Sequence, residues 1–273
     1  MSTQIFYFSG TGNSLSVVRE ISNQLSDSEI IPIVSAAKNK VNATTAERVG
    51  LVFPVHAFSF PQIVEKFIKS LSIKPDTYLF AIATRMGSSC KVFENMDKIF
   101  AAKGIKISAK WFLDMPNNYL TLLPISNDEQ TKSILKSSDG KVKGMAQAIQ
   151  NKEIHEEQDP HYSFFEKYIL FAFLGAIYRK TNYFGLENKF YADDKCNNCQ
   201  VCTTVCLSGK IAKGENKPYW RKDVPCYHCL ACIHYCPCAA IQNTKKTEKK
   251  GRYHHPSITY RDIATQKGCK NKV

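Results

Sequence analysis

The sequence predicts an α/β fold in which a doubly wound, five-stranded parallel sheet is followed by a small cysteine-rich domain. Three observations carry this prediction. Apolar runs of strand length alternate with stretches of helical spacing over residues 1 to about 150. A loop rich in glycine and hydroxyl side chains follows the first apolar run, and eight of the 11 cysteines form two copies of one pattern. Strands that alternate with crossover helices form parallel sheets, which bind ligands at the carboxyl ends of the strands.

The expected strands are short apolar runs, as is typical of strands covered on both faces of a parallel sheet. They occupy residues 5–8, 30–34, 50–55, 78–83 and 105–113. Helical spacing fills the intervals at 15–25, 62–71, 92–102 and near 134–149. In the second of these stretches, Val64, Phe67, Ile68 and Leu71 form a stripe with the spacing i, i+3, i+4, i+7 that is typical of an amphipathic helix.

Residues 152–160 (KEIHEEQDP) are charged, end in a proline and break this alternation. We therefore expect a sheet domain at 1–155, a helical linker at 156–190, a cysteine-rich domain at 191–244 and a basic tail at 245–273. The longest apolar run, at 168–178, has eleven residues, well short of the roughly 20 that span a bilayer. It predicts a core or interdomain helix, with a helix lying in the membrane interface as the alternative.

The cysteines form two runs that each read C-x2-C-x2-C-x3-C. Three evenly spaced thiolates can wrap one face of a four-iron cluster, while the fourth cysteine of each run ligates the other cluster. We therefore expect two 4Fe-4S clusters, the first on Cys196, Cys199, Cys202 and Cys236, and the second on Cys226, Cys229, Cys232 and Cys206. A pair of zinc knuckles is the alternative, but tetrahedral zinc leaves the third cysteine of each run unexplained.

Residues 9–14 read SGTGNS and stand between the first expected strand and an amphipathic helix. Glycines permit a tight turn, and hydroxyl and N–H groups converge at a helix N-terminus that favours an anion. No lysine follows, as a Walker loop requires, and Leu15 stands where a dinucleotide fingerprint needs its third glycine. Such a cradle suits a single terminal phosphate, as in FMN. The alternative is a glycine turn with an ordinary serine cap.

The loop SGTGNS resembles the FMN phosphate loop of flavodoxins, and the cysteine runs resemble a bacterial ferredoxin with two four-iron clusters. Together with MPNNY at 115–119 and GRYHHP at 251–256, their order is similar to that of single-chain flavodoxin–ferredoxin fusions, the ferrodoxin family of anaerobes. The resemblance covers essentially the whole chain. It implies a flavodoxin-like sheet and a small α+β ferredoxin-like domain.

The same resemblance implies which residues surround FMN. Residues 9–14 would hold the phosphate, 54–61 would lie beside the isoalloxazine ring, and 84–89 with 117–119 would close the other side. The expected flavin-binding residues are Ser9, Gly10, Thr11, Gly12, Asn13, Ser14, Pro54, Val55, His56, Ala57, Phe58, Thr84, Arg85, Met86, Gly87, Asn118 and Tyr119. Two positions depart from the family: a histidine at 56 replaces the usual tyrosine, and 85–87 replace a more glycine-rich turn.

Basic residues concentrate at the C-terminus. The formal net charge is +13, and residues 245–273 carry nine Lys or Arg against two acidic residues. This tail predicts docking to an acidic redox partner, with a solvated extension as the alternative. No RNA or DNA module accompanies the tail, so nucleic-acid binding is not expected. The first eight residues show no secretion signal, and thiolate ligands need a reducing compartment, so we expect the cytoplasm.

These features predict a soluble protein that passes electrons between two four-iron clusters, FMN and partner proteins. The alternative is a reductase whose flavin meets a diffusible acceptor such as a quinone, a nitro compound or oxygen. A weaker alternative is a ferredoxin without FMN and with a vestigial flavodoxin fold.

Overall fold

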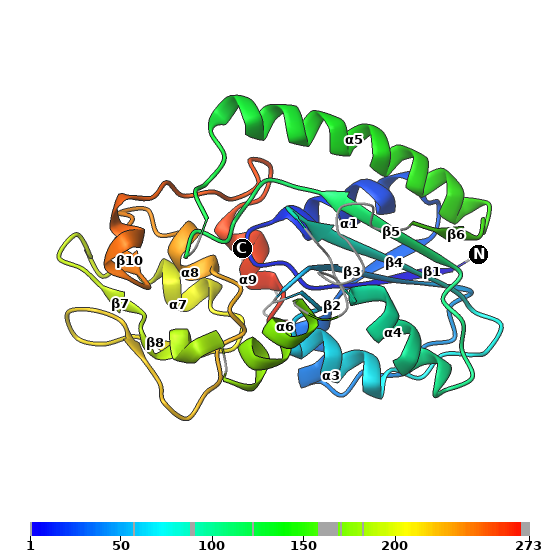
Figure 1. The fold of residues 1–273 in the computed structure, drawn as a ribbon, viewed down its shortest axis with the longest axis horizontal. Coiled ribbons are helices and arrows are strands. Elements are labelled where there is room, and N and C mark those ends of the chain that lie inside the picture. Colours follow the sequence, from blue (N-terminus) through cyan, green and yellow to red (C-terminus); the bar gives the residue numbers. More distant parts are fainter. Residues whose placement is uncertain are drawn as a thin grey trace.

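The computed structural model describes residues 2–56, 58–87, 91–121, 123–157, 169, 171–181 and 183–268. A parallel sheet of order β2-β1-β3-β4-β5-β6 dominates the first half of the chain (Figure 1). Its strands are β1 (Thr3–Tyr7), β2 (Ser28–Pro32), β3 (Arg48–Pro54), β4 (Tyr78–Arg85), β5 (Ala109–Asp114) and β6 (His155–Glu156). The order of the first five strands is that of a flavodoxin-like sheet. The predicted fold class is confirmed.

The sheet has six strands where five were expected, and β6 is the addition. This two-residue strand pairs in parallel with β5, His155 opposite Ala109 and Glu156 opposite Lys110. The Lys110 ammonium donates to Glu156 Oε1 at 2.9 Å, and the His155 ring stacks on Trp111 at 5.2 Å. These side-chain contacts hold the strand at the edge of the sheet. Its two residues are polar, so no apolar pattern in the sequence indicates a strand here.

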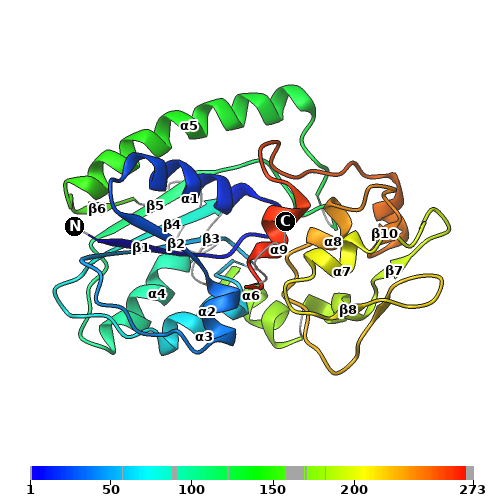
Figure 2. The same cartoon turned by 180° about the vertical axis from the view of Figure 1, so that it is seen from behind.

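Helices cover both faces of the sheet (Figures 1 and 2). One face carries α1 (Asn13–Gln24) and α5 (Asp128–Gln150), and the other carries α2 (Ile33–Lys38), α3 (Gln62–Ser70) and α4 (Val92–Ala101). In α3 the buried residues Val64, Phe67 and Ile68 belong to the predicted stripe. All eight residues of β4 are buried, as expected for a strand between two helical layers.

Two expected strands have other bounds than predicted: the first begins and ends two residues earlier, and the second is shorter. The apolar run 30–34 divides, because β2 ends at Pro32 and α2 begins at Ile33. Proline lacks an N–H group for the ladder and is tolerated at the start of a helix. The run 105–113 forms β5 only from Ala109 onward, although Ile105 and Ile107 are also buried in the core. Burial, not strand pairing, explains their apolar character.

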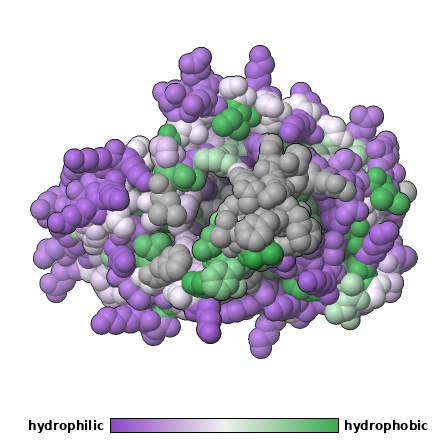
Figure 3. Space-filling model, in the orientation of Figure 1, coloured by the Kyte–Doolittle hydropathy of each residue, from purple (hydrophilic) through white to green (hydrophobic). Residues whose placement is uncertain are grey.

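The second half of the chain is built from short elements beside the carboxyl ends of β1, β3, β4 and β5 (Figures 1 and 2). They are α6 (Phe171–Lys180), η2 (Tyr183–Asn188), β7 (Tyr191–Ala192), α7 (Val201–Val205), β8 (Ile211–Ala212), β9 (Tyr219–Trp220), α8 (Ala231–His234), β10 (Ile241–Gln242), η3 (Lys245–Lys249) and α9 (Tyr260–Thr265). Among the described residues, no helix is long and apolar enough to cross a membrane. In Figure 3 hydrophilic residues cover most of one face, and hydrophobic residues gather near its middle.

The backbone repeats itself across the two cysteine runs. Asn198 and His228 are 30 residues apart and have φ of 57° and 50°; Gln200 and Leu230, also 30 apart, have φ of 65° and 58°. Left-handed backbone is unfavourable for residues other than glycine, so its recurrence at equivalent positions shows one loop conformation used twice. A short helix follows each loop, α7 after Gln200 and α8 after Leu230.

Two cations of the basic C-terminal segment hold parts of the chain together. Lys250 Nζ donates to the carbonyl oxygen of Leu120 at 2.5 Å. Arg252 donates to the carbonyl oxygens of Ala239 and Ile241 at 3.2 and 3.3 Å. The sequence does not distinguish a cation that binds backbone carbonyls from one that is free to bind a partner protein. The expected partner-binding tail therefore includes Lys250 and Arg252, although both have a structural role.

Candidate functional site

A cavity of about 700 Å³ lies at the carboxyl ends of β1, β3, β4 and β5. This is where parallel α/β sheets bind their ligands, and the volume is within the range of small-molecule sites. The expected flavin residues that line it are Ser9, Gly10, Thr11, Asn13, Ser14, Pro54, Val55, His56, Phe58, Thr84, Arg85, Met86, Gly87, Asn118 and Tyr119. Gly12, the N-cap of α1, belongs to the same loop but does not line the cavity, and Ala57 lies outside the described residues.

Residues of the second half of the chain also line this cavity. Leu174 and Tyr178 come from α6, and His228, Cys229 and Leu230 come from the second cysteine run. Sequence reasoning missed all five, since no local signal places a cysteine loop beside a phosphate loop. It also missed Met115, Pro116 and Leu123, although the first two lie in the segment MPNNY; Asn117, expected within 117–119, lines the cavity as well.

The phosphate loop, residues 9–14, is buried and cross-linked by hydrogen bonds. Ser9 Oγ accepts from the Gly12 N–H at 3.2 Å, and Thr11 Oγ1 accepts from Asn118 Nδ2 at 2.8 Å. The Ser14 hydroxyl bonds Thr84 Oγ1 at 2.9 Å. With glycine as N-cap, no side chain takes the first N–H groups of α1, which leaves them for an anion. The loop therefore fits a phosphate group.

Both glycines of the phosphate loop are required by close contacts. A Cβ at Gly10 would lie 2.1 Å from the carbonyl oxygen of Cys229. Gly12 has φ of 100°, and a Cβ there would lie 2.8 Å from Ile258 Cβ. The left-handed backbone at Gly12 disfavours any other residue. The neighbours that exclude side chains at both positions come from residues 229–258, in the second half of the chain.

His56 forms part of the wall beside the phosphate loop. Its backbone bonds that of Ser59 in both directions, at 2.8 and 2.9 Å, and Phe58 between them has φ of 61°. Burial lowers the pKa of His56 to about 4, so the ring is neutral at pH 7. Its Nδ1 is buried without a hydrogen-bond partner among the described residues. Such an atom can bond a ligand in the cavity.

Arg85 lines the cavity with a side chain that other residues hold. Its Nε donates to Asp114 Oδ1 at 2.9 Å, and its guanidinium lies 4.5 Å from the centre of the Phe112 ring. Arg85, expected beside the flavin, lines the same cavity as the phosphate loop. An ion pair with Asp114 and a stacked ring give its charge a structural role in the described structure.

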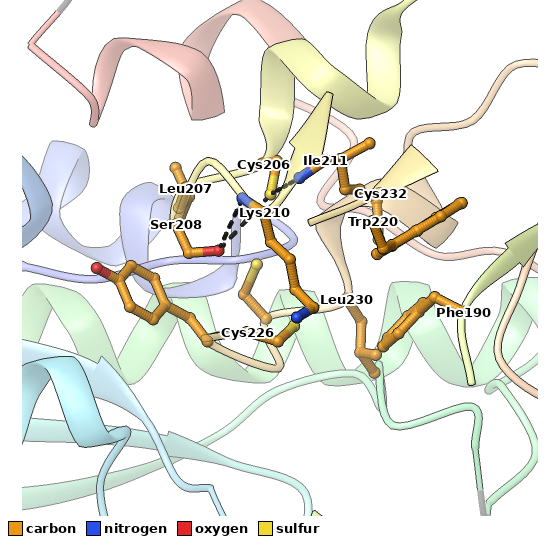
Figure 4. A pocket seen from close by; sticks show the side chains of 12 residues that line it. Phe190, Cys206, Leu207, Ser208, Lys210, Ile211, Trp220, Cys226, Leu230 and Cys232 are labelled. Carbon is orange, nitrogen blue, oxygen red and sulfur yellow. Dashed lines mark hydrogen bonds between the residues drawn. The ribbon is translucent and has the colours of Figure 1, made fainter. Parts of the chain in front are cut away.

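Cys206, Cys226, Cys229 and Cys232 line one small cavity of about 20 Å³, together with Lys210 and Trp220 (Figure 4). Cys206 Sγ accepts from the Ile211 N–H at 3.4 Å, and Cys226 Sγ accepts from the His228 N–H at 3.3 Å. Such N–H bonds stabilise sulfur in its thiolate form. Cys206 comes from the first run, so the structure brings together one set of four that the sequence predicted.

The other four cysteines are also neighbours. Burial raises the pKa of Cys202 to about 12, and the nearby thiol groups of Cys236, Cys196 and Cys199 add to this effect. Within the described part of the chain, no group of three or more His, Cys, Asp or Glu side chains is arranged to hold a metal ion. A four-iron cluster bonds each cysteine through a separate iron, so its ligands stand around a larger group than one ion.

Lys210 is a buried cation beside the second set of cysteines (Figure 4). Its ammonium donates to the carbonyl oxygens of Arg221 at 2.9 Å and Val224 at 2.8 Å. These bonds hold the segment that leads into Cys226. The sequence contained no signal for this role, since Lys210 is one of 37 basic residues.

Comparison with known proteins finds a domain family for the first part of the chain and one similar protein. The family model "Flavodoxin domain" matches residues 4–104. Pyruvate synthase subunit PorD of Methanocaldococcus jannaschii is 32% identical over 75 residues, which are 28% of this chain and 85% of PorD.

Among solved structures, a flavodoxin from the domain Archaea is 13% identical with a TM-score of 0.38, over 55% of this chain and 99% of that one. An FMN-dependent NADH-azoreductase of Bacillus anthracis, in complex with FMN, is 11% identical with a TM-score of 0.37, over 55% and 99% of the two chains. By its match to PorD the chain belongs to the family of pyruvate synthase subunit PorD, and its N-terminal part is a flavodoxin-like domain.

Proposed function

We propose that this protein transfers electrons between two 4Fe-4S clusters, a bound FMN and external redox partners. The phosphate loop would hold the FMN phosphate, and the two sets of four cysteines would hold the clusters. A four-iron cluster passes one electron at a time and FMN accepts one or two, so the pair supplies exchange between one- and two-electron donors. The match to a flavodoxin domain and to PorD supports a redox role.

One observation carries this proposal above all. The segment 228–230 lines the large cavity, and Cys229 and Leu230 also line the small cavity among Cys206, Cys226 and Cys232. The two candidate cofactor sites therefore share a wall. The two sites have Cys229 and Leu230 in common, and this proximity supports direct electron exchange between the cofactors.

The first prediction concerns cofactor content. Anaerobically reconstituted protein should contain about eight irons, about eight sulfides and about one FMN per chain, because two complete cysteine sets and one phosphate loop are present. Chemical iron and sulfide analysis with flavin absorbance measures this. About four irons, or zinc in place of iron, would contradict the two clusters, while eight irons without flavin would leave a ferredoxin with a vestigial flavodoxin fold.

The second prediction concerns Thr11. Thr11→Val keeps the shape of the side chain but leaves Asn118 Nδ2 without its acceptor, so the phosphate loop loses a cross-link. We expect FMN affinity to fall about tenfold, the effect of about 1.4 kcal/mol. Fluorescence titration of the apoprotein measures it. Thr131→Val on α5, away from the cavity, is the matched control, and equal affinities in the two variants would place the phosphate elsewhere.

A second candidate function is an FMN-dependent reductase of a small apolar acceptor. The cavity rim favours it, because the lining side chains of Met86, Leu123 and Leu174 are 45%, 43% and 38% exposed. Such a rim admits a quinone or a nitroaromatic compound. Anaerobic turnover of reduced protein with these oxidants separates the two functions: rapid multiple turnover supports the reductase, and its absence supports electron transfer between proteins.

A further inference from the structure

The chain returns to the phosphate loop at its C-terminal end. We call residues 251–268 the C-terminal strap; they follow η3, include α9 and lie beside the end of β1 (Figures 1 and 2). Gln266 binds both backbone groups of Ser9, accepting from its N–H at 3.0 Å and donating to its carbonyl oxygen at 2.8 Å. The strap thus acts on the phosphate loop across 257 residues of sequence.

Two further hydrogen bonds join the strap to Thr11 and Asn13 of the phosphate loop. The His255 N–H donates to the carbonyl oxygen of Thr11 at 2.8 Å. The Tyr253 hydroxyl donates to Asn13 Oδ1 at 2.7 Å, while Asn13 Nδ2 donates to the carbonyl oxygen of Pro116 at 3.1 Å. Both polar ends of the Asn13 side chain are therefore engaged, one of them by the strap. Three of the six loop residues are held from outside the flavodoxin-like domain.

His234, the last residue of α8, stands between Cys232 and Cys236 in the sequence and connects the strap to the loop a second time. Its Nδ1 accepts from the Tyr253 N–H at 3.0 Å, so in the neutral ring Nε2 carries the proton and donates to the carbonyl oxygen of Asn118 at 2.7 Å. Asn118 in turn bonds Thr11. A continuous chain of hydrogen bonds links the strap, the cysteine region and the phosphate loop.

The strap is itself firmly anchored. Gln266 is fully buried, and Ile258 is 1% exposed against the loop at Gly12. Arg19 of α1 pairs with Asp262 of α9, and the Tyr235 hydroxyl donates to the carbonyl oxygen of Ile258 at 3.2 Å. A buried and doubly anchored segment holds its partners in one conformation, which is the condition for a preorganised binding site.

We propose that the C-terminal strap sets the conformation of the phosphate loop and thereby the affinity for the phosphate group of FMN, with Tyr253 as a positioning residue. This rests on the proposed function, in which residues 9–14 hold that phosphate. The flavin site is then completed by a segment that follows the cysteine region, and the flavodoxin-like domain alone holds the phosphate more weakly.

Tyr253→Phe tests this with the loss of one hydroxyl group. Tyr260→Phe is the matched control, because it removes the same atom from the strap, where among the described residues the hydroxyl accepts a hydrogen bond from the exposed Arg261 alone. Fluorescence titrations with FMN and with riboflavin, which lacks the phosphate, are made in phosphate-free buffer. Tyr253→Phe should weaken FMN binding about three- to tenfold and leave riboflavin binding unchanged, so that preference for FMN falls. Gln266→Leu, which removes both bonds to Ser9, should lower the preference for FMN further.

The outcomes separate the strap from the phosphate loop. If the wild type does not prefer FMN to riboflavin, the assignment of the phosphate loop fails and the strap proposal with it. If the wild type prefers FMN and Tyr253→Phe retains the full preference, only the strap proposal is overturned. Equal weakening of both flavins would show a general loss of structure and would also overturn it.

Discussion

Cys206→Ser should remove the cluster bound by Cys226, Cys229 and Cys232. It should leave the cluster bound by Cys196, Cys199 and Cys202 intact, although Cys206 belongs to the same run as these three. The four residues line one small cavity, and Cys206 is buried there. A serine hydroxyl is a poor ligand for iron compared with a thiolate, so the second cluster loses a quarter of its ligands. Iron per chain should fall from about eight to about four. Iron analysis and EPR of the reduced protein measure the change.

Cys238→Ser is the control for this experiment. Cys238 is partly buried and lies outside both sets of four, so its replacement should retain the full iron content. Loss of the signal from the cluster of Cys196, Cys199 and Cys202 in the Cys206 variant would show that each run ligates its own cluster. The crossed assignment would then be wrong.

Gly10→Ala should push the phosphate loop away from the backbone at Cys229. The added Cβ would lie 2.1 Å from the carbonyl oxygen of Cys229, and both groups belong to backbones held by many other contacts. Overpacking of this kind costs about 1–3 kcal/mol of stability. We expect a lower midpoint of thermal unfolding and an FMN affinity at least tenfold weaker, since the loop that binds the phosphate must move.

Gly140→Ala provides the comparison, because a Cβ at this position of α5 meets nothing within 4 Å. Alanine favours helix over glycine by about 1 kcal/mol, so this variant should be as stable as the wild type or more so. An unfolding midpoint and an FMN affinity unchanged by Gly10→Ala would mean that the two loops do not touch in solution.

Local patterns predicted most of the sheet, because the apolar residues of a buried strand or an amphipathic helix recur at a regular spacing in its own sequence. The strand at His155 escaped detection, since the side chains of Lys110 and Trp111, 44 to 46 residues earlier in the sequence, hold it. A strand of two residues is too short to show the alternation of apolar and polar residues that indicates a strand. The division at Pro32 was likewise hidden within one apolar run.

The sequence predicted those site residues that lie together in one short segment. It did not predict the residues that reach the site only through tertiary contacts. The residues SGTGNS and the cysteine spacing each contain their chemistry locally. The placement of His228 and Leu230 beside the phosphate loop, and the hold of Gln266 on Ser9, depend on segments that meet only in the fold. Lys250 and Arg252 show the same limit, since their backbone partners are not visible in the sequence.

The hold of Gln266 on Ser9 has a consequence for the timing of synthesis. Ser9 is made 257 residues before Gln266, and translation adds about 5–20 residues per second, so about 13–50 s separate them. The flavodoxin-like sheet can fold within that interval, because its strands and helices end at residue 156. The phosphate loop reaches its final hydrogen bonds only afterwards. A nascent chain would therefore complete this loop only once Gln266 has been made, after both cysteine runs.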